Sequence, residues 1–160
     1  MPSKAPPEVL ELAKIIGGFI QHWGFKSVHG QIWTLIFLSK EPLNSTLLTK
    51  RLSVSKALIS LAVKDLLHYE VIEVVEKRNK EIYFRSNPDI FGVIRKVLEK
   101  REKVMLEKAE QCVKDLEQKK LPENSNFLID ESRVHEIGQM IEMAQSSLAW
   151  FSNSFPKPHE

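Results

Sequence analysis

Lys56, Ser60 and Lys64 follow one another at intervals of four residues in the stretch LSVSKALISLAVKDLLHYE, residues 52–70. In a helix this interval places side chains on one face, so two ammonium groups and a hydroxyl would donate hydrogen bonds in one direction. Ala57 and Leu61 lie on the same face and offer apolar contact. Such a face suits a partner that presents many acceptors, negative charge and some methyl groups.

The helix that carries this face has an opposite, apolar side. Ile59, Val63 and Leu66 cluster within roughly 60° at about 100° per residue, and Ser55 is a suitable N-cap. We therefore predict a helix over about residues 55–69 that buries one side and exposes the other. The exposed side is either a solvated surface or a contact surface, and the surrounding sequence has to decide between them.

Positive charge concentrates around this helix. Between Lys50 and Arg85 the chain has eight basic and five acidic residues, a net charge of +3, whereas the rest of the chain totals −1. The whole chain of 160 residues carries only +2, so the distribution of charge is more informative than its total. A local excess of cations favours phosphate groups as partners.

Three further helices are expected before this one. Apolar residues at three- and four-residue spacing predict helices over about residues 7–23, 28–39 and 44–52. Asn44 or Ser45 would cap the third helix, and a short turn, 53–55, would join it to the next.

The period of the sequence changes after residue 70. Residues 71–77 and 81–86 are β-branched and aromatic with rough alternation, and the polar residues 78–80 lie between them. This pattern predicts a β-hairpin.

The C-terminal half is helical. Asn87 followed by Pro88 and Asp89 is a helix start with Asn87 as N-cap. We predict a long helix to about Lys120, with a coiled-coil spacing that Arg101 interrupts. The segment LPENSN, 121–126, would break this helix. A last helix over about 130–151 would carry one regular apolar seam of Val134, Ile137, Ile141, Ala144, Leu148 and Phe151.

The order of a short helix, a tight turn, a second helix and a hairpin is that of a winged helix-turn-helix. In this arrangement the second helix enters the major groove of double-stranded DNA, and the hairpin, or wing, would contact the backbone or the minor groove. We expect the following residues to contact DNA: Ser45, Thr46, Lys50, Ser55, Lys56, Ala57, Ser60, Leu61, Lys64, Lys77, Arg78, Asn79 and Lys80. Ala57 and Leu61 would contact thymine methyl groups.

Long apolar stripes at both ends of the chain need partners that one domain of this size does not easily supply. A homodimer is the simple solution, and an intrachain bundle is the alternative. The expected dimerisation residues are Val9, Leu12, Ile16, Phe19, Ile94, Leu98, Met105, Ile137, Ile141, Leu148 and Phe151.

The predicted fold is therefore mainly α with a small β-hairpin (α+β), a winged helix-turn-helix with long N- and C-terminal dimerisation helices. Residues 1–24 would form an N-terminal dimerisation helix, 25–86 the DNA-binding domain and 87–160 a C-terminal helical dimerisation region.

At this point the chain resembles the GbsR/MarR-type winged-helix transcription regulators. The resemblance covers about residues 7–120 and is strongest in EPLNSTLLTKRLSVSKALIS, DLLHYEVIEVVEKRNKEIYFR and NPDIFGVIRKVLEKRE. It implies a homodimer that binds a pseudo-palindromic operator, and we expect a repressor. The chain departs from the family at Ser53 and Glu70, where glycine is common, and at Leu58 and Leu61, where small polar residues are more usual. Two exposed leucines would also fit a winged-helix protein–protein interaction module, which is the alternative function.

Other residue patterns exclude several classes of function. The five histidines lack metal-ligand spacing, and no nucleophile motif or phosphate-binding loop is present, so we expect neither an enzyme nor a cofactor. Cys112 is the only cysteine and forms no internal disulfide. Without a targeting segment or a membrane-length apolar run, a soluble cytoplasmic protein is expected.

An effector pocket is a further hypothesis. Trp23, Trp33, Trp150 and Phe151 could line it, and analogy with the family makes a quaternary ammonium compound such as choline or betaine compatible with them. Ordinary core and dimer packing is the alternative for these four residues.

Overall fold

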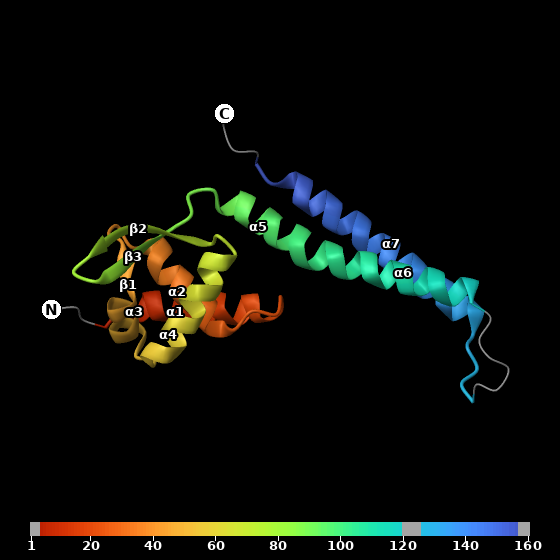
Figure 1. The fold of residues 1–160 in the computed structure, drawn as a ribbon, viewed down its shortest axis with the longest axis horizontal. Coiled ribbons are helices and arrows are strands. Elements are labelled where there is room, and N and C mark those ends of the chain that lie inside the picture. The colour runs from red at the N-terminus through yellow and green to blue at the C-terminus, as the bar shows by residue number, and fades with distance from the viewer. Residues whose placement is uncertain (1–3, 120–125, 157–160) are drawn as a thin grey trace. The chain divides into compact units, whose positions relative to one another are not determined.

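A computed structural model describes residues 4–119 and 126–156 of the chain. It divides the chain into two compact units, residues 1–93 and 94–160, and Figure 1 labels their elements. The structure is mainly helical with a small antiparallel sheet, as predicted.

The first unit contains four helices and three strands. In chain order they are α1 (Pro7–Gln21), α2 (Ser27–Leu38), β1 (Leu43–Asn44), α3 (Ser45–Leu52), α4 (Lys56–His68), β2 (Ile72–Arg78) and β3 (Glu81–Ser86). All four predicted helices and the predicted hairpin are confirmed, with boundaries shifted by one to two residues. Pro7 occupies the first turn of α1, where its missing N–H has no cost.

Two glycines let α1 and α2 approach closely. A Cβ atom on Gly30 would lie 2.8 Å from the Gly17 Cα atom, and one on Gly17 would lie 2.5 Å from the backbone oxygen of Ser27. A side chain at either position would therefore collide with backbone atoms of the facing helix.

One apolar core joins the helices to the sheet. Its most deeply buried side chains come from α2, β1, α3, α4 and β2, and they are Ile32, Leu43, Leu48, Ile59 and Ile72. Each such side chain contributes roughly 1.5–3 kcal/mol through removal of apolar surface from water. The buried side of α4 is therefore part of the main core, and this fixes the direction of its exposed side.

The sheet has three strands in the order β1-β3-β2, not the hairpin alone. β1 pairs only two residues with β3, Leu43 with Phe84 and Asn44 with Tyr83. A strand this short has no alternating pattern to detect. A register shift between Val74 and Glu76 also disrupts the alternation expected in β2, so Val74 is exposed.

Two residues, Asn79 and Lys80, form the hairpin turn. Both have positive φ, 50° and 66°, as a type I′ turn requires. The predicted turn of residues 78–80 is one residue too long, because Arg78 still pairs with Glu81.

Ser53 ends α3 in the left-handed conformation, with φ 56° and ψ 42°. Glu70, which follows α4, also has positive φ, 59°. These are the two positions at which the sequence departs from the glycine of the family it resembles. At both positions the backbone adopts the conformation that glycine favours, although a side chain in it is strained.

Replacing Ser53 by glycine is expected to stabilise the protein. Ser53→Gly should raise the free energy of unfolding by about 0.5–1 kcal/mol, because relief of left-handed strain exceeds the added freedom of the unfolded chain. Ser39 caps α2 with a φ of −79°, so Ser39→Gly should lower stability by a similar amount. Urea unfolding of both variants measures this, and equal destabilisation by both would contradict the prediction.

The second unit contains a broken helix and a long helix. α5 (Ile90–Leu98), whose residues 90–93 still belong to the first unit, continues without a gap into the π-helix η1 (Glu99–Lys103) and α6 (Val104–Gln118), and α7 (Glu131–Ser154) completes the second unit. The π-helical segment contains Arg101 and accounts for the interruption of the heptad spacing there. The predicted break at 121–126 lies, except for Asn126, outside the described residues.

The start of α5 differs from the prediction. The side chain of Asp89, not Asn87, caps it: Gly92 N–H donates to Asp89 Oδ1 at 2.9 Å. Asn87 instead accepts from the backbone N–H of Asp89 at 2.9 Å, so it closes the turn before the helix. Asp130 caps α7 by accepting a hydrogen bond from Ser132 N–H, and its hydrogen bonds from Ser132 lower the pKa of its carboxyl group.

α7 lies antiparallel to α6 (Figure 1). Val113 and Val134 are buried, and Gln145 donates a hydrogen bond to Glu110 at 3.0 Å. Lys114 also donates to Glu110, which lowers the pKa of that carboxyl group.

The predicted seam of α7 divides into two rows. One row is at least half-buried, and it contains Val134, Ile141 and Leu148. The other is exposed, and it contains Ile137, Ala144 and Phe151.

Candidate nucleic-acid interface

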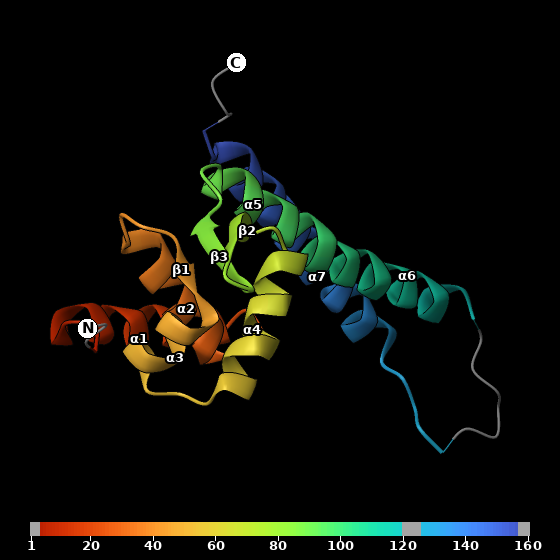
Figure 2. The same ribbon diagram turned by 60° about the vertical axis from the view of Figure 1, so that its left-hand side comes forward.

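α3 and α4 form a pair of helices joined by the turn Ser53–Ser55 (Figure 2). Asn44 caps α3 by accepting a hydrogen bond from Leu47 N–H at 2.8 Å. Ser55 caps α4 in the same way, from Leu58 N–H at 3.2 Å. The two caps fix the residues at which α3 and α4 begin. The start of α4 lies at the surface.

α4 separates its residues into two faces, as the sequence predicts. Ile59, Ala62, Val63 and Leu66 are buried in the core. The opposite side, called here the α4 face, is exposed and consists of Lys56, Ala57, Ser60, Leu61 and Lys64.

Leu58 is not exposed, contrary to the expectation from the sequence. It is half-buried and packs against the core of the first unit, because on the helix it lies about 40° from Ala62, which is buried. Leu61, in contrast, is 60% exposed. Of the two leucines, Leu61 alone is available to a partner on the α4 face.

A buried histidine attaches α4 to α2. His29 is 4% exposed, and its Nε2 lies 3.0 Å from Asp65 Oδ2, while its Nδ1 accepts from the backbone N–H of Lys26 at 3.0 Å. The Nδ1 contact requires the tautomer in which Nε2 donates to Asp65. Sequence reasoning missed this pair, since nothing in the sequence links residues that lie 36 positions apart.

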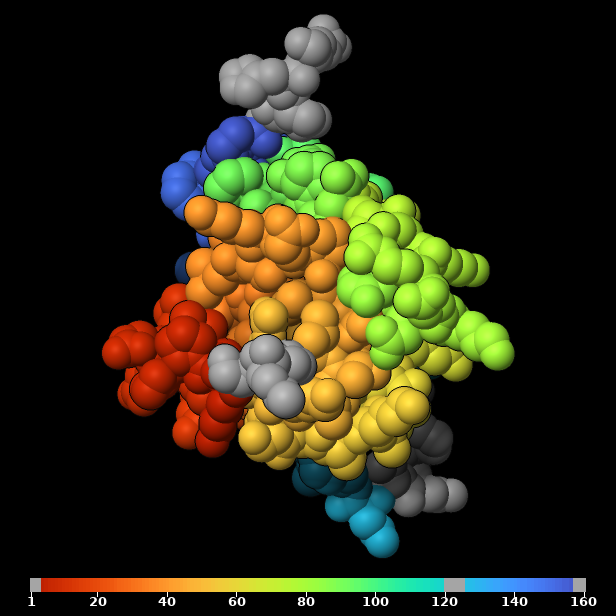
Figure 3. Space-filling model, turned by 90° about the vertical axis from the view of Figure 1, so that its left-hand side faces the viewer, coloured from red at the N-terminus to blue at the C-terminus, as the bar shows by residue number. Residues whose placement is uncertain are grey.

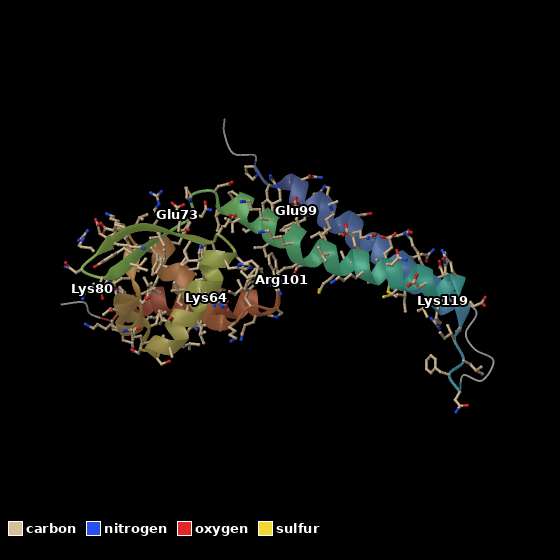
Figure 4. All side chains as sticks on the ribbon, viewed as in Figure 1. Lys64, Glu73, Lys80, Glu99, Arg101 and Lys119 are labelled. Atoms are coloured by element: carbon tan, nitrogen blue, oxygen red, sulfur yellow. The ribbon has the colours of Figure 1, made fainter. Side chains whose placement is uncertain are left out.

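The β2–β3 hairpin contains both paired and unpaired cations. Arg78 donates to Glu76 at 2.7 Å and lies 5.4 Å from the ring centre of Tyr83, and the Glu76 contact raises its pKa. Arg85 pairs with Glu73. Lys77 and Lys80 are exposed and form no ion pair within the described residues. Figure 4 shows Lys80 at the turn of the hairpin and Lys64 on α4.

Glu81 connects the hairpin to the start of α3. Its carboxylate accepts hydrogen bonds from Asn44 Nδ2 at 2.5 Å and from Thr46 Oγ1 at 2.8 Å. Thr46, expected to contact DNA, therefore already uses its hydroxyl group within the protein. Ser45 is half-buried, whereas Lys50 on the same helix is exposed. Sequence reasoning missed Glu81 because its partners lie 37 and 35 residues away.

The structure thus brings the expected DNA-contacting residues together in the first unit, from α3, the start of α4 and the hairpin. Figure 3 shows the surface of α3 and α4 in gold beside the hairpin in yellow-green. Lys56 and Lys64 form no ion pair within the residues that the structure describes. This surface can donate hydrogen bonds and positive charge to an extended anionic partner.

The expected dimerisation residues differ in exposure. On α1, Val9 and Ile16 are half-buried, whereas Leu12 is 42% and Phe19 61% exposed. In the second unit Ile94, Leu98, Ile141 and Leu148 are half-buried or buried. Met105, Ile137 and Phe151 are exposed. Other exposed apolar side chains on these helices are absent from the prediction, among them Ile15, Leu116 and Met140.

Three of the four aromatic residues proposed for an effector pocket pack on different aromatic partners. In the first unit Trp23 packs on Phe19 and Trp33 stacks on Phe37. In the second unit Trp150 is 72% exposed and Phe151 packs on Phe155. In the first unit Trp23 and Trp33 thus have different ring partners and do not share one aromatic cluster.

Residues 4–119 and 126–156 contain neither a metal-binding cluster nor a membrane-spanning helix. No three histidine, cysteine, aspartate or glutamate residues there are grouped so that they could bind a metal ion. None of the helices in those ranges has the length and apolar character needed to span a membrane.

Comparison with known proteins finds structural similarity but no sequence match. No protein-family model and no curated protein sequence matches the chain. A crystal structure of a transcriptional regulator is similar to it over 92% of this chain and 97% of the other, with a TM-score of 0.60 and 18% sequence identity. The two chains share a fold. At this identity the likeness establishes the fold and not the function.

Proposed function

We propose that this protein is a sequence-specific, double-stranded DNA-binding transcriptional regulator of the winged helix-turn-helix type. The observation that carries the proposal is the α4 face, exposed at the start of a helix whose other side is buried, next to a hairpin with unpaired lysines. Its fold is shared with a transcriptional regulator. Helix-turn-helix proteins bind DNA with this part of the second helix.

In this proposal α4 is the recognition helix and enters the major groove. Lys56, Ser60 and Lys64 contact base edges, and Ala57 and Leu61 contact thymine methyl groups. Lys50 and Ser55 contact the backbone. Lys77, Arg78, Asn79 and Lys80, at the end of the wing, contact phosphates or the minor groove.

The second unit supports a homodimer. On α6, Met105, Cys112 and Leu116 fall within roughly 40° of one another and roughly 90° from the side that packs on α7. On α7 the row of Ile137, Ala144 and Phe151 lies roughly 60° from the buried row. The two helices are antiparallel. When both are viewed from the same end, a step to a higher residue number therefore rotates the side-chain direction clockwise on one helix and anticlockwise on the other.

The two rows therefore lie on the same side of the helix pair. Together they form one apolar surface, called here the α6–α7 face. A second copy of the chain that packs through the same face would bury both rows in a four-helix arrangement. Leu12, Ile15 and Phe19 on α1 form a second exposed stripe for the same dimer.

The dimer determines the form of the operator. Two recognition helices related by a two-fold axis bind half-sites about 34–36 Å apart in a pseudo-palindrome. We propose a repressor of the GbsR/MarR type that acts in the cytoplasm, with a small-molecule effector that changes the relative populations of two dimer conformations.

The alternative function is a winged-helix protein–protein interaction module. Leu61 is the observation that favours it, because an apolar side chain 60% exposed on the α4 face would also suit a protein partner. Such a module would bind DNA weakly or without sequence preference.

Selection of duplexes from a random library, followed by titration at several salt concentrations, separates the two functions. A regulator should enrich pseudo-palindromic duplexes and lose affinity as salt rises, with a logarithmic slope of about −0.9 for each phosphate contact. Failure to bind any duplex in a salt-dependent way would contradict the DNA-binding proposal and favour the interaction module.

A further inference from the structure

Glu81 is the first residue of β3, and its carboxylate is shared by two residues at the start of α3. The bonds from Asn44 Nδ2 and Thr46 Oγ1, at 2.5 and 2.8 Å, use both carboxylate oxygens. The hydroxyl group of Tyr83 lies 3.5 Å from one of them. A single side chain therefore joins the hairpin to the helix pair.

Asn44 makes this junction specific. Its side chain is almost fully buried, with 3% exposure, and it bonds to Leu47 N–H through one end and to Glu81 through the other. A buried amide that loses a partner is costly. The arrangement of β3 against α3 that satisfies both ends of Asn44 is therefore favoured over others.

Backbone pairing alone attaches the hairpin to β1 over only a short stretch. β1 pairs with β3 only at Tyr83 and Phe84, so this pairing ends before Glu81. Arg78, at the end of the hairpin, donates its hydrogen bond to Glu76 and lies over the Tyr83 ring, and both partners belong to the hairpin itself. The contacts of Glu81 extend the attachment towards Lys80, which Figure 4 shows at the turn.

We propose that Glu81 is a positioning residue that holds the cationic end of the hairpin in a fixed place beside α3 and α4. It thereby sets which DNA phosphates Lys77, Arg78 and Lys80 reach. The DNA part rests on the proposed function, whereas the attachment itself is a property of the free protein. Removing an acid ordinarily strengthens binding to DNA, and positioning by Glu81 predicts the opposite sign.

Three variants test whether removal of Glu81 weakens or strengthens DNA binding, with the duplexes selected from the random library. Glu81→Ala should weaken binding to all duplexes about tenfold and lower the salt slope by about two units, as the hairpin contacts are lost. Glu81→Gln should stay within about threefold of the original protein, because its amide can accept from Asn44 and donate to Thr46. Glu73→Ala is the matched control, since it removes an acid from the same hairpin, and should bind equally or more tightly. Equal binding by Glu81→Ala and Glu73→Ala would overturn the proposal.

Hydrogen exchange in the free protein tests the attachment without DNA. Glu81→Ala should accelerate exchange of the amides from Lys77 to Ile82 at least about fivefold, while Glu73→Ala should not. The amides of Ile59 and Leu66 in α4 should keep their protection, which shows that the unit remains folded. Equal exchange in the two variants would overturn the positioning role. Absence of DNA binding by the original protein would instead contradict the proposed function.

Discussion

Lys64→Glu is expected to abolish sequence-specific DNA binding. Lys64 is exposed in the middle of the α4 face and forms no ion pair within the described residues. Loss of a base contact costs about 1–3 kcal/mol of discrimination, and the new carboxylate adds repulsion from the DNA. Affinity for the selected operator should fall about a hundredfold or more, and the ratio of specific to non-specific affinity should fall with it. Gel-shift titration against operator and scrambled duplexes measures both quantities.

Lys80→Glu is the comparison variant, because it reverses a charge that is expected to contact phosphate and not bases. Lys80 belongs to the hairpin turn, so its reversal should weaken binding to every duplex alike and lower the salt slope by about one unit. Lys14→Glu, on the exposed side of α1, changes the net charge of the same unit equally and should have little effect. If Lys64→Glu and Lys80→Glu reduced affinity for all duplexes equally, the proposed division between base and phosphate contacts would be wrong.

The sequence was sufficient to predict the α4 face because the relevant signal is periodic and local. The spacing of Ile59, Val63 and Leu66 identifies the buried side, and the remaining positions follow from helix geometry. The exposure of Leu58 was predicted wrongly, because residues at the edge of an apolar stripe are assigned to core or surface by tertiary packing. Packing of the core around α4 determines whether Leu58 is buried, and the local sequence pattern does not show this.

Other features were missed because they join distant parts of the chain or are too short to show a period. β1 contains two residues, and its pairing depends on β3 about 40 positions later. The link from Glu81 to Asn44 and that from His29 to Asp65 connect elements that only the folded core brings together. The π-helical segment around Arg101 left a detectable sign, an interrupted heptad spacing, although a π-helix was not predicted from it.

Met105→Glu is expected to dissociate the proposed homodimer. Met105 is 65% exposed and lies on the α6–α7 face, roughly 90° from the side of α6 that packs on α7. In the dimer it would be buried, and an unpaired carboxylate there costs several kcal/mol. The dissociation constant should rise at least about a hundredfold. Sedimentation velocity over a range of protein concentrations measures the change.

Met143→Glu is the matched control, because Met143 is 70% exposed in the same unit but points roughly 170° away from the packed side of α7. This variant should remain dimeric.

The thiol of Cys112, exposed in the single chain, provides an independent readout. A dimer through the α6–α7 face should slow chemical modification of this thiol, and Met105→Glu should restore the faster modification. Because a monomer holds only one recognition helix, Met105→Glu should also lose operator affinity while Met143→Glu keeps it. Equal oligomeric states for the two variants would show that the apolar face is covered in some other way than by a second copy.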